Sequence, residues 1–419
     1  MIDVRLLRDD PEAVIAALAR RDIARSDVER VIDLDRRWRE VTAEVDGLRA
    51  QQNVRSRAIG TAPAEERQEL IAAAAELKEP LRRAEEEQVA VAEARDEALA
   101  AIPNLPHPDA PAGGEDDSVE LRREGSKPEF DFGVRDHVEL LEPPGALDLA
   151  RAAKVSGARF FYLKGEGALL EFALVRYALD VAMRHGHQPV IPPVLVRDEA
   201  LYGTGFFPTD EQQIFAMRDD PLYLVGTSEV SLAGMHMDEI LDTVPVRYAG
   251  FSSCFRREAG SYGRDTRGVF RVHQFDKVEL FSFVGPDASS DEHERILAIE
   301  EEIMGGLGLH YRVVDIASGD LGASAARKFD LEAWLPGQDA YREVTSCSNT
   351  TDYQARRLRV RWRRDDGSTE LVHTLNGTAL AVQRTIIALV ETHQNADGSV
   401  VVPEVLQPHL GREVLFARA

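Results

Sequence analysis

Ionisable side chains crowd one segment of the sequence, FRREAGSYGRDTRGVFRVHQFDKVELF, at residues 255–281. Gly260, Gly263 and Gly268 predict a loop between two strands. Alternate side chains of a strand share a face, so the residues after the loop predict one ionic face with a single aromatic ring: Arg271, His273, Phe275, Lys277 and Glu279. The opposite face carries residues suited to a hydrophobic core: Phe270, Val272, Val278 and Leu280.

The ionic face, with the arginines before it, has the parts needed to bind a nucleotide beside an amino acid. The planar fork of arginine suits phosphate, and Arg256, Arg257, Arg264 and Arg267 lie in the same segment. An aromatic ring can stack on a base, and a carboxylate can hold an ammonium group. The alternative is a solvated strand with surface ion pairs, which contribute little. This segment alone leaves both interpretations open.

Three other segments carry polar groups where apolar strands are expected to end. LYLVGTSEV (222–230) reaches Thr227, Ser228 and Glu229, and YREVTSCSN (341–349) reaches Glu343 and Ser346. A carboxylate and a hydroxyl suit a magnesium ion that also takes phosphate oxygens. HTLNGTALAVQR (373–384) predicts a strand through Asn376, Gly377 and Thr378, followed by a helix with Arg384 in its second turn. Each segment also has a structural explanation, but together they favour one site.

The elements that would carry these groups form two regions. Residues 30–100 are nearly free of Gly and Pro, and apolar residues recur at three- and four-residue steps, which predicts two long helices with a narrow seam. Gly60 and Pro63 predict the turn of an antiparallel hairpin. The hairpin could be a dimerisation element or spacer, or it could be a binding arm.

The second region has an α+β pattern, in which hairpin-like strands with separate helices predict a mostly antiparallel sheet. The stretch at 102–118 is rich in Pro, Gly and Asp, which is typical of a linker. We therefore expect an N-terminal hairpin at 1–104, a linker at 105–125 and a catalytic domain at 126–419.

Composition narrows the function classes. Lys+Arg 50 against Asp+Glu 73 gives a net charge of −23 over 419 residues, which argues against nonspecific polyanion binding but leaves local basic patches open. Cys254 and Cys347 cannot form a Cys-rich zinc site, so no zinc is expected. The sequence shows no secretory signal and no membrane-length apolar run. The expected location is the cytoplasm, with no membrane partner.

Taken together, these segments resemble the bacterial-type seryl-tRNA synthetases, a family of class II aminoacyl-tRNA synthetases, and the resemblance covers nearly the whole sequence. FRREAGSYGRDTRGVFRVHQFDKVE resembles the motif 2 of the family, and NGTALAVQR resembles motif 3. VIPPVLV is a weaker match to motif 1, while TSEV and REVTSCSN resemble the serine and ATP segments. The resemblance implies a class II catalytic domain, ATP and Mg²⁺ as cofactors, and a homodimer.

The resemblance also implies residue roles. Arg256, Glu279 and Arg384 would be catalytic. ATP would contact Arg256, Arg257, Glu258, Val272, Phe275, Glu343, Val344, Thr345, Ser346 and Arg384, with Mg²⁺ on Glu343 and Ser346. L-serine would contact Thr227, Ser228, Glu229, Arg256, Glu279, Asn376 and Thr378. The hairpin would bind serine tRNA, with selenocysteine tRNA as a further candidate, through Arg36, Arg37, Arg49 and Arg55.

Several alternatives stay open. The arm arginines could instead pair with neighbouring Asp and Glu. The run RLRVRWRR (357–364) could present alternate arginines to RNA or protect an edge strand. Ser231, Ala379 and Gln383 depart from the family pattern, and a second, antibiotic-resistant synthetase copy would look similar. The rival functions are a ligase that loads an amino acid onto a carrier protein and a noncatalytic RNA-binding scaffold.

Overall fold

A computed structural model describes residues 1–260, 263 and 265–417, so Arg264 lies outside the described residues. The chain forms two compact units, Met1–Pro103 and Asn104–Ala419. No helix among the described residues has the length and apolar character needed to cross a membrane.

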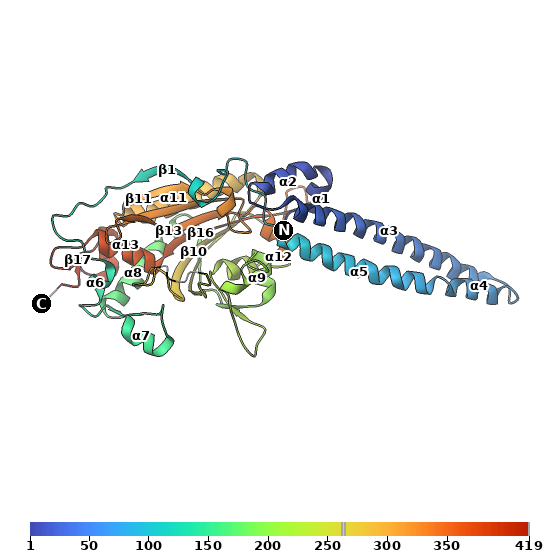
Figure 1. The fold of residues 1–419 in the computed structure, drawn as a ribbon, viewed down its shortest axis with the longest axis horizontal. Helices are drawn as coiled ribbons and strands as arrows, with labels where there is room; N and C mark the ends of the chain where they lie inside the picture. The colour runs from blue at the N-terminus through green and yellow to red at the C-terminus, as the bar shows by residue number, and fades with distance from the viewer. Residues whose placement is uncertain (261–262, 264, 418–419) are drawn as a thin grey trace. The chain divides into compact units, whose positions relative to one another are not determined.

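The first unit is built around two long antiparallel helices (Figure 1). Its helices are α1 (Val4–Asp9), α2 (Pro11–Ala19), α3 (Arg25–Thr61), α4 (Arg67–Ala75) and α5 (Lys78–Ala101). The seam between α3 and α5 buries Val41, Val45, Leu81 and Ala84. The expected hairpin is therefore present, although its returning side is divided between α4 and α5. Buried Asp35 accepts hydrogen bonds from Arg8 at 2.8 and 2.7 Å, and this ties α1 to α3.

The second unit is organised by a mixed, mostly antiparallel sheet, as expected for the α+β class. Among the described residues its order is β1-β11-β12-β13-β16-β10-β9-β4, and only β4 and β9 pair in parallel. The strands are β1 (Val119–Glu124), β4 (Gln188–Val190), β9 (Val246–Phe255), β10 (Gln274–Val284), β11 (Tyr311–Asp315), β12 (Arg327–Leu335), β13 (Ala340–Asn349) and β16 (His373–Ala381). Residues 119–124, inside the expected linker, thus form the edge strand β1.

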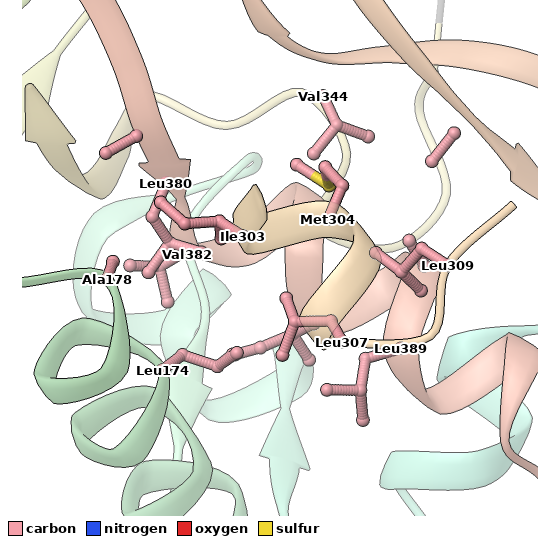
Figure 2. Close-up of a cluster of buried hydrophobic side chains, with 14 of the residues drawn as sticks. Leu174, Ala178, Ile303, Met304, Leu307, Leu309, Val344, Leu380, Val382 and Leu389 are labelled. Atoms are coloured by element: carbon pink, nitrogen blue, oxygen red, sulfur yellow. The ribbon is translucent and has the colours of Figure 1, made fainter. Parts of the chain in front are cut away.

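Helices cover one face of this sheet. They are α8 (Glu166–Arg184), α11 (Ser289–Gly306) and α13 (Val382–Thr392), and Figure 2 shows part of the apolar cluster between them and the strands: Leu174, Ala178, Ile303, Met304, Val344, Leu380, Val382 and Leu389. Burying a side chain of this size contributes about 1.5–3 kcal/mol. The helices therefore hold the central strands as a rigid base.

The opposite face is covered only in part. Phe281 and Phe283 of β10 lie in an apolar cluster with residues of α10 (Glu229–Gly234) and α12 (Tyr353–Leu358). Nearer the start of β10, the residues on the same face are Lys277 and Glu279, which line a cavity. Phe281 and Phe283 are buried in the same strand that carries Lys277 and Glu279. The buried aromatic pair therefore fixes the position of the cavity wall.

Smaller elements complete the second unit. Its other helices are α6 (His137–Leu141), α7 (Leu149–Ser156), α9 (Asp198–Thr204) and α14 (Gln407–Leu410). Short strands form separate small sheets: β2 (Leu147–Asp148), β3 (Tyr162–Leu163), β5 (Leu195–Val196), β6 (Phe215–Ala216), β7 (Tyr223–Leu224), β8 (Ile240–Leu241), β14 (Arg361–Arg363), β15 (Thr369–Leu371), β17 (Val400–Val401) and β18 (Val414–Leu415).

Three local predictions were wrong. The strand expected directly after the loop begins only at Gln274, so Arg271 and His273 lie before it. The run at 357–364 is not one strand, because Arg357 lies in α12 and Arg359 has a left-handed backbone with φ of 58°. Arg357 is only 4% exposed and donates to the Tyr202 and Phe207 carbonyls at 2.8 and 3.0 Å, so it does not share an exposed face with Arg361. Arg384 lies in the first turn of α13, not the second.

Candidate active site

A cavity of about 400 Å³ lies on the open part of the sheet face. Its wall combines residues from four predicted segments: Thr227, Glu229, Arg256, Glu258, Val272, Phe275, Glu279, Glu343, Val344, Ser346, Asn376, Thr378 and Arg384. The Phe275 ring therefore lines the cavity and is not enclosed in the hydrophobic core. Arg256 and Arg384 line the same cavity. The segments are far apart in sequence, and the pairing of β9, β10, β13 and β16 brings three of them together, while Thr227 and Glu229 lie just before and at the start of α10.

Two β-bulges set which side chains reach the cavity. In β13 the register passes from Leu331↔Thr345 to Glu332↔Glu343, so Val344 is an extra residue. In β16 it passes from Val278↔Leu380 to Glu279↔Thr378, so Ala379 is extra. An extra residue reverses the alternation of a strand. Glu343 and Ser346, three positions apart, consequently face the same cavity, as do Thr378 and Ala381.

Buried charge marks one end of the site. Glu279 of β10 is 2% exposed, and its carboxylate forms an ion pair with Lys277. Burial raises the pKa of Glu279 to about 7, although the Lys277 ammonium acts in the opposite direction. Glu229, at the start of α10, is also buried, and burial raises its pKa. Two carboxyls and one ammonium thus share a polar pocket.

The two cavity arginines are each held by a main-chain carbonyl and lie over a ring. Arg256 donates from Nε to the Gly226 carbonyl at 3.1 Å, and its guanidinium lies 5.1 Å from the Phe275 ring centre. Arg384 donates to the Glu343 carbonyl at 2.9 Å and lies 4.6 Å from the Phe270 ring centre. Each side chain is therefore oriented while part of its donor fork remains available.

Glu343 and Ser346 supply oxygen atoms suited to a divalent cation. Burial acts to raise the pKa of Glu343, but the Arg384 and Lys328 charges outweigh it and hold the pKa at about 2. The carboxylate is thus ionised, and it accepts from Arg384 at 3.2 Å. Magnesium commonly takes only one or two protein carboxylates and completes its shell with waters and phosphates. This donor pair fits that pattern, although no cluster of three or more His, Cys, Asp or Glu suited to a metal occurs among the described residues.

The loop before β10 is held by an ion-pair network. Arg271 donates to Glu258 at 2.6 Å, and Arg342 of β13 donates to both Asp265 oxygens at 2.9 and 2.8 Å. The Arg342 guanidinium also lies 3.9 Å from the Phe270 ring centre. The expected adenine partner Glu258 is thus paired with arginine, and a base that approached it would exchange that contact.

Some predicted site residues lie outside the cavity wall. Arg257 is exposed, and its guanidinium lies 5.8 Å from the Phe215 ring centre. Ser228 is fully buried and donates to the Gly250 carbonyl at 3.4 Å. Thr345 is 1% exposed and lies on the other side of β13 because of the bulge. The wall also contains residues that were not predicted as site residues: Thr204, Gly205, Phe206, Asp210, Val269, Phe270, Arg271, Lys277, Gly322, Ala323, Ser324, Ala325, Lys328, Ser348, Ala381 and Gln383.

Of these unpredicted residues, Lys277 and Arg271 had a signal in the sequence, because the alternation after the loop predicted both on one ionic face. In the structure only Lys277 lies in that strand, since β10 begins at Gln274. Residues 322–325 and 204–206 had none, since short small-residue loops and helix ends occur throughout the chain.

The predicted arm arginines have partners within the first unit. Arg37 pairs with Glu87, Arg49 with Glu85 at 2.8 Å, and Arg36 with Asp33 at 2.7 Å. Arg55 donates to the Ala73 carbonyl. These contacts agree with the alternative in which the arginines pair with neighbouring Asp and Glu, and they leave a tRNA-binding role as a proposal.

Comparisons with known proteins agree over the whole length. Residues 214–393 match the family model of the tRNA synthetase class II core domain (G, H, P, S and T), and residues 1–106 match that of the seryl-tRNA synthetase N-terminal domain. The seryl-tRNA synthetase of Pyrococcus horikoshii complexed with ATP superimposes with a TM-score of 0.93 at 41% identity, covering 100% of both chains. A prolyl-tRNA synthetase of Giardia lamblia shares only the fold, at 13% identity and a TM-score of 0.56.

The fold and the site thus define a class II aminoacyl-tRNA synthetase. The serine–tRNA ligase of Nocardia farcinica is 52% identical over 417 residues, covering 99% of both chains, and that of Thermobifida fusca is 51% identical over the same coverage. The chain belongs to the seryl-tRNA synthetase family.

Proposed function

We propose that this protein is a serine–tRNA ligase. It activates L-serine with ATP to give seryl-adenylate and pyrophosphate, and then transfers the seryl group to the 3′-terminal adenosine of serine tRNA. The observation that carries the proposal is the single cavity that joins two oriented arginines and a ring to a pair of buried carboxyls. The first set suits a nucleotide triphosphate, and the second suits an amino acid.

In the first step an oxygen of the serine carboxylate attacks the α-phosphorus, and pyrophosphate leaves. Phosphoryl chemistry of this kind depends on positioning and charge stabilisation more than on covalent help from the protein. Arg256 would hold the α-phosphate, and Arg384 would hold the far end of the triphosphate. Phe275 would stack on the adenine ring. The Glu258 carboxylate would accept a hydrogen bond from the adenine amino group.

Glu343 and Ser346 would hold a magnesium ion that, when bound, neutralises charge on the phosphate oxygens. Arg384 would then move its contact from Glu343 to a phosphate. In that exchange the negatively charged phosphate takes the place of the negatively charged Glu343 carboxylate beside the Arg384 guanidinium.

Selection of serine is proposed to rest on the polar end of the cavity. Glu229, Glu279, Thr227, Asn376 and Thr378 would surround the ammonium and hydroxyl groups of the substrate. A site built to hydrogen-bond a hydroxyl rejects an analogue without one, because its own buried groups stay unpaired. Alanine would therefore be a poor substrate.

In the second step the first unit, Met1–Pro103, would serve as the tRNA-binding arm. Helical arms of this type contact the RNA backbone and read its shape more than its base sequence. The protein would act as a homodimer in the cytoplasm, in line with the family to which it belongs. The arm also disfavours a carrier-protein ligase, because that alternative gives it no role.

The test is serine-dependent exchange between ATP and pyrophosphate, followed by charging of serine tRNA. Arg256→Ala should lower exchange by about 10²–10³-fold, the usual loss for one donor that stabilises transition-state charge. Arg123→Ala is the matched control, since this arginine of β1 pairs with Glu120 at 2.8 Å and is not part of the cavity wall, and it should keep near-normal exchange. Equal activity of the two variants, or exchange with no dependence on serine, would overturn the proposal.

A further inference from the structure

Glu229 is held from behind by a buried amide. Gln354 of α12 is 0% exposed, and its Nε2 donates to Glu229 Oε1 at 2.7 Å and to the Thr204 carbonyl at 3.1 Å. Gln354 does not line the cavity, whereas Glu229 and Thr204 do. It therefore acts on the site only through its neighbours.

The orientation of the amide is fixed by its other end. Gln354 Oε1 accepts from the Thr374 hydroxyl at 2.8 Å and from the Thr350 hydroxyl at 3.4 Å, and both threonines are 0% exposed. A flipped amide would direct its oxygen at the Thr204 carbonyl, which can only accept. The NH₂ group thus faces Glu229, and the threonines hold it there.

The same network reaches residues near the start of the second unit. Asn104, which is 4% exposed, donates from Nδ2 to the Thr350 carbonyl at 2.8 Å and to the Ser324 carbonyl at 2.9 Å. Ser324 belongs to the cavity wall. The support of Gln354 is therefore a continuous buried set of hydrogen bonds rather than one contact.

We propose that Gln354 is a positioning residue for serine: by occupying Oε1 of Glu229, it directs the rest of that carboxylate toward the ammonium group of the substrate. The inference rests on the proposed function, which makes Glu229 a serine contact. A buried carboxylate without a partner costs more than a paired one, and the amide acts against burial, which is the larger effect and raises the pKa of Glu229.

Kinetics of serine-dependent pyrophosphate exchange test this inference. Gln354→Met keeps the length of the side chain and removes the amide, so we expect KM for serine to rise about 10- to 100-fold, the range for losing a hydrogen bond to a charged group. KM for ATP should change less than about 2-fold, because none of the nucleotide contacts proposed here touches Gln354. A parallel rise in both constants, or no rise in either, would refute the positioning role.

Two further variants keep the outcomes distinguishable. If Gln354→Met does not fold, Thr374→Val decides the question, because it removes the nearer of the two hydroxyls that donate to the amide oxygen, at 2.8 Å against 3.4 Å for Thr350. A serine-specific rise supports the inference, and an unchanged KM overturns it. Glu229→Gln tests the assignment of Glu229 as a serine contact, while loss of the serine dependence of exchange in the unaltered protein would refute the proposed function itself. If Glu229→Gln leaves KM for serine unchanged, the assignment of Glu229 fails; if it raises KM while Gln354→Met does not, only the inference fails. In the Glu229→Gln background the effect of Gln354→Met should shrink, and undiminished additivity would count against it.

Discussion

At the scale of single residues, several charged groups of the site lie in pairs of opposite sign. Arg384 lies against Glu343, Arg271 against Glu258, and Lys277 against Glu279. Each pair contains at least one group proposed to contact a substrate. Among these groups only Lys277 and Glu279 are buried, with side chains 7% and 3% exposed, so there the loss of one partner would leave a buried charge unpaired, which would be strongly unfavourable.

Arg384 allows the proposed exchange of its carboxylate partner for a phosphate to be tested, because its planar fork contacts a carbonyl, a carboxylate and the face of Phe270 at once. Lysine offers a single ammonium and cannot reproduce that geometry. We expect Arg384→Lys to raise KM for ATP about 10-fold or more, in line with the loss of a charge-assisted bond, while KM for serine stays nearly unchanged. Pyrophosphate exchange at varied ATP concentration measures both.

A matched control is Arg327→Lys. Arg327 also lies over a ring, Phe329, and pairs with Asp315 at 2.7 Å, but it is not part of the cavity wall. It should leave both constants unchanged. A similar rise in KM for ATP in the two variants would mean that general loss of arginine packing, not phosphate binding, is being measured.

The sequence indicated residues that we propose as substrate contacts but not those that support them. Phe275 and Glu279 stand in one segment with an obvious strand pattern, so their shared face could be predicted, whereas Arg256 follows β9 and precedes the loop. Gln354 lies in a short helix with no comparable pattern, and its contact with Glu229 spans 125 positions. Only the folded structure brings the two together.

At the scale of elements, the β-bulges explain where the sequence pattern failed. A strict two-residue alternation places Glu343 and Ser346 on opposite faces of β13, yet both line the cavity because Val344 is an extra residue. The identities of Val344 and Ala379 do not predict a bulge, since both are apolar residues that are common in regular strands. The fold class was predictable from the succession of strands and helices, whereas the phase of each strand was not.

Helix α11 and the sheet meet at a buried histidine whose ionisation links stability to pH. The His293 ring stacks on Phe329 of β12 at 4.7 Å, and its Nε2 lies 3.2 Å from the Cys347 carbonyl. Burial lowers the pKa of His293 to about 4. In the unfolded chain the His293 ring is protonated as the pH falls below about 6.5, whereas in the folded protein it is protonated only near pH 4. The free energy of unfolding therefore falls as the pH drops from about 6.5 to about 4.

We expect His293→Gln, which can still donate to a carbonyl, to lose this part of the pH dependence. Between pH 7.0 and 5.5 the free energy of unfolding of the unaltered protein should fall by about 1–2 kcal/mol more than that of the variant. Urea denaturation at the two pH values measures the difference. Ser290→Ala is the control, because Ser290 lies exposed on the same helix as His293 and has no titratable group, and it should behave like the unaltered protein. Identical pH dependence in all three would refute the assignment.

At the scale of the whole molecule, an acidic protein of net charge −23 is proposed to bind a polyanion. The arm offers a way to do so, since its arginines are paired but exposed. Arg37 and Glu87 are 48% and 44% exposed, and Arg49 and Glu85 are 55% and 40% exposed. Exposed pairs contribute about 0–1 kcal/mol, so a phosphate can displace the carboxylate at small cost. The pairs therefore limit nonspecific binding without preventing a specific one.

This view makes opposite predictions for the two members of one pair. Arg37→Gln should weaken the binding of serine tRNA and make its salt dependence shallower by about 0.7–0.9 per lost phosphate contact. Glu87→Gln should strengthen binding, because it frees Arg37 from its partner. Affinities over a series of salt concentrations measure both effects.

Arg82→Gln is the control: Arg82 lies on α5, pairs with Glu79 at 2.6 Å and is not a proposed tRNA contact. If Arg37→Gln and Arg82→Gln change the salt slope equally, the arm attracts RNA only through its overall charge; if neither Arg37→Gln nor Glu87→Gln has an effect, Arg37 serves only to pair with Glu87.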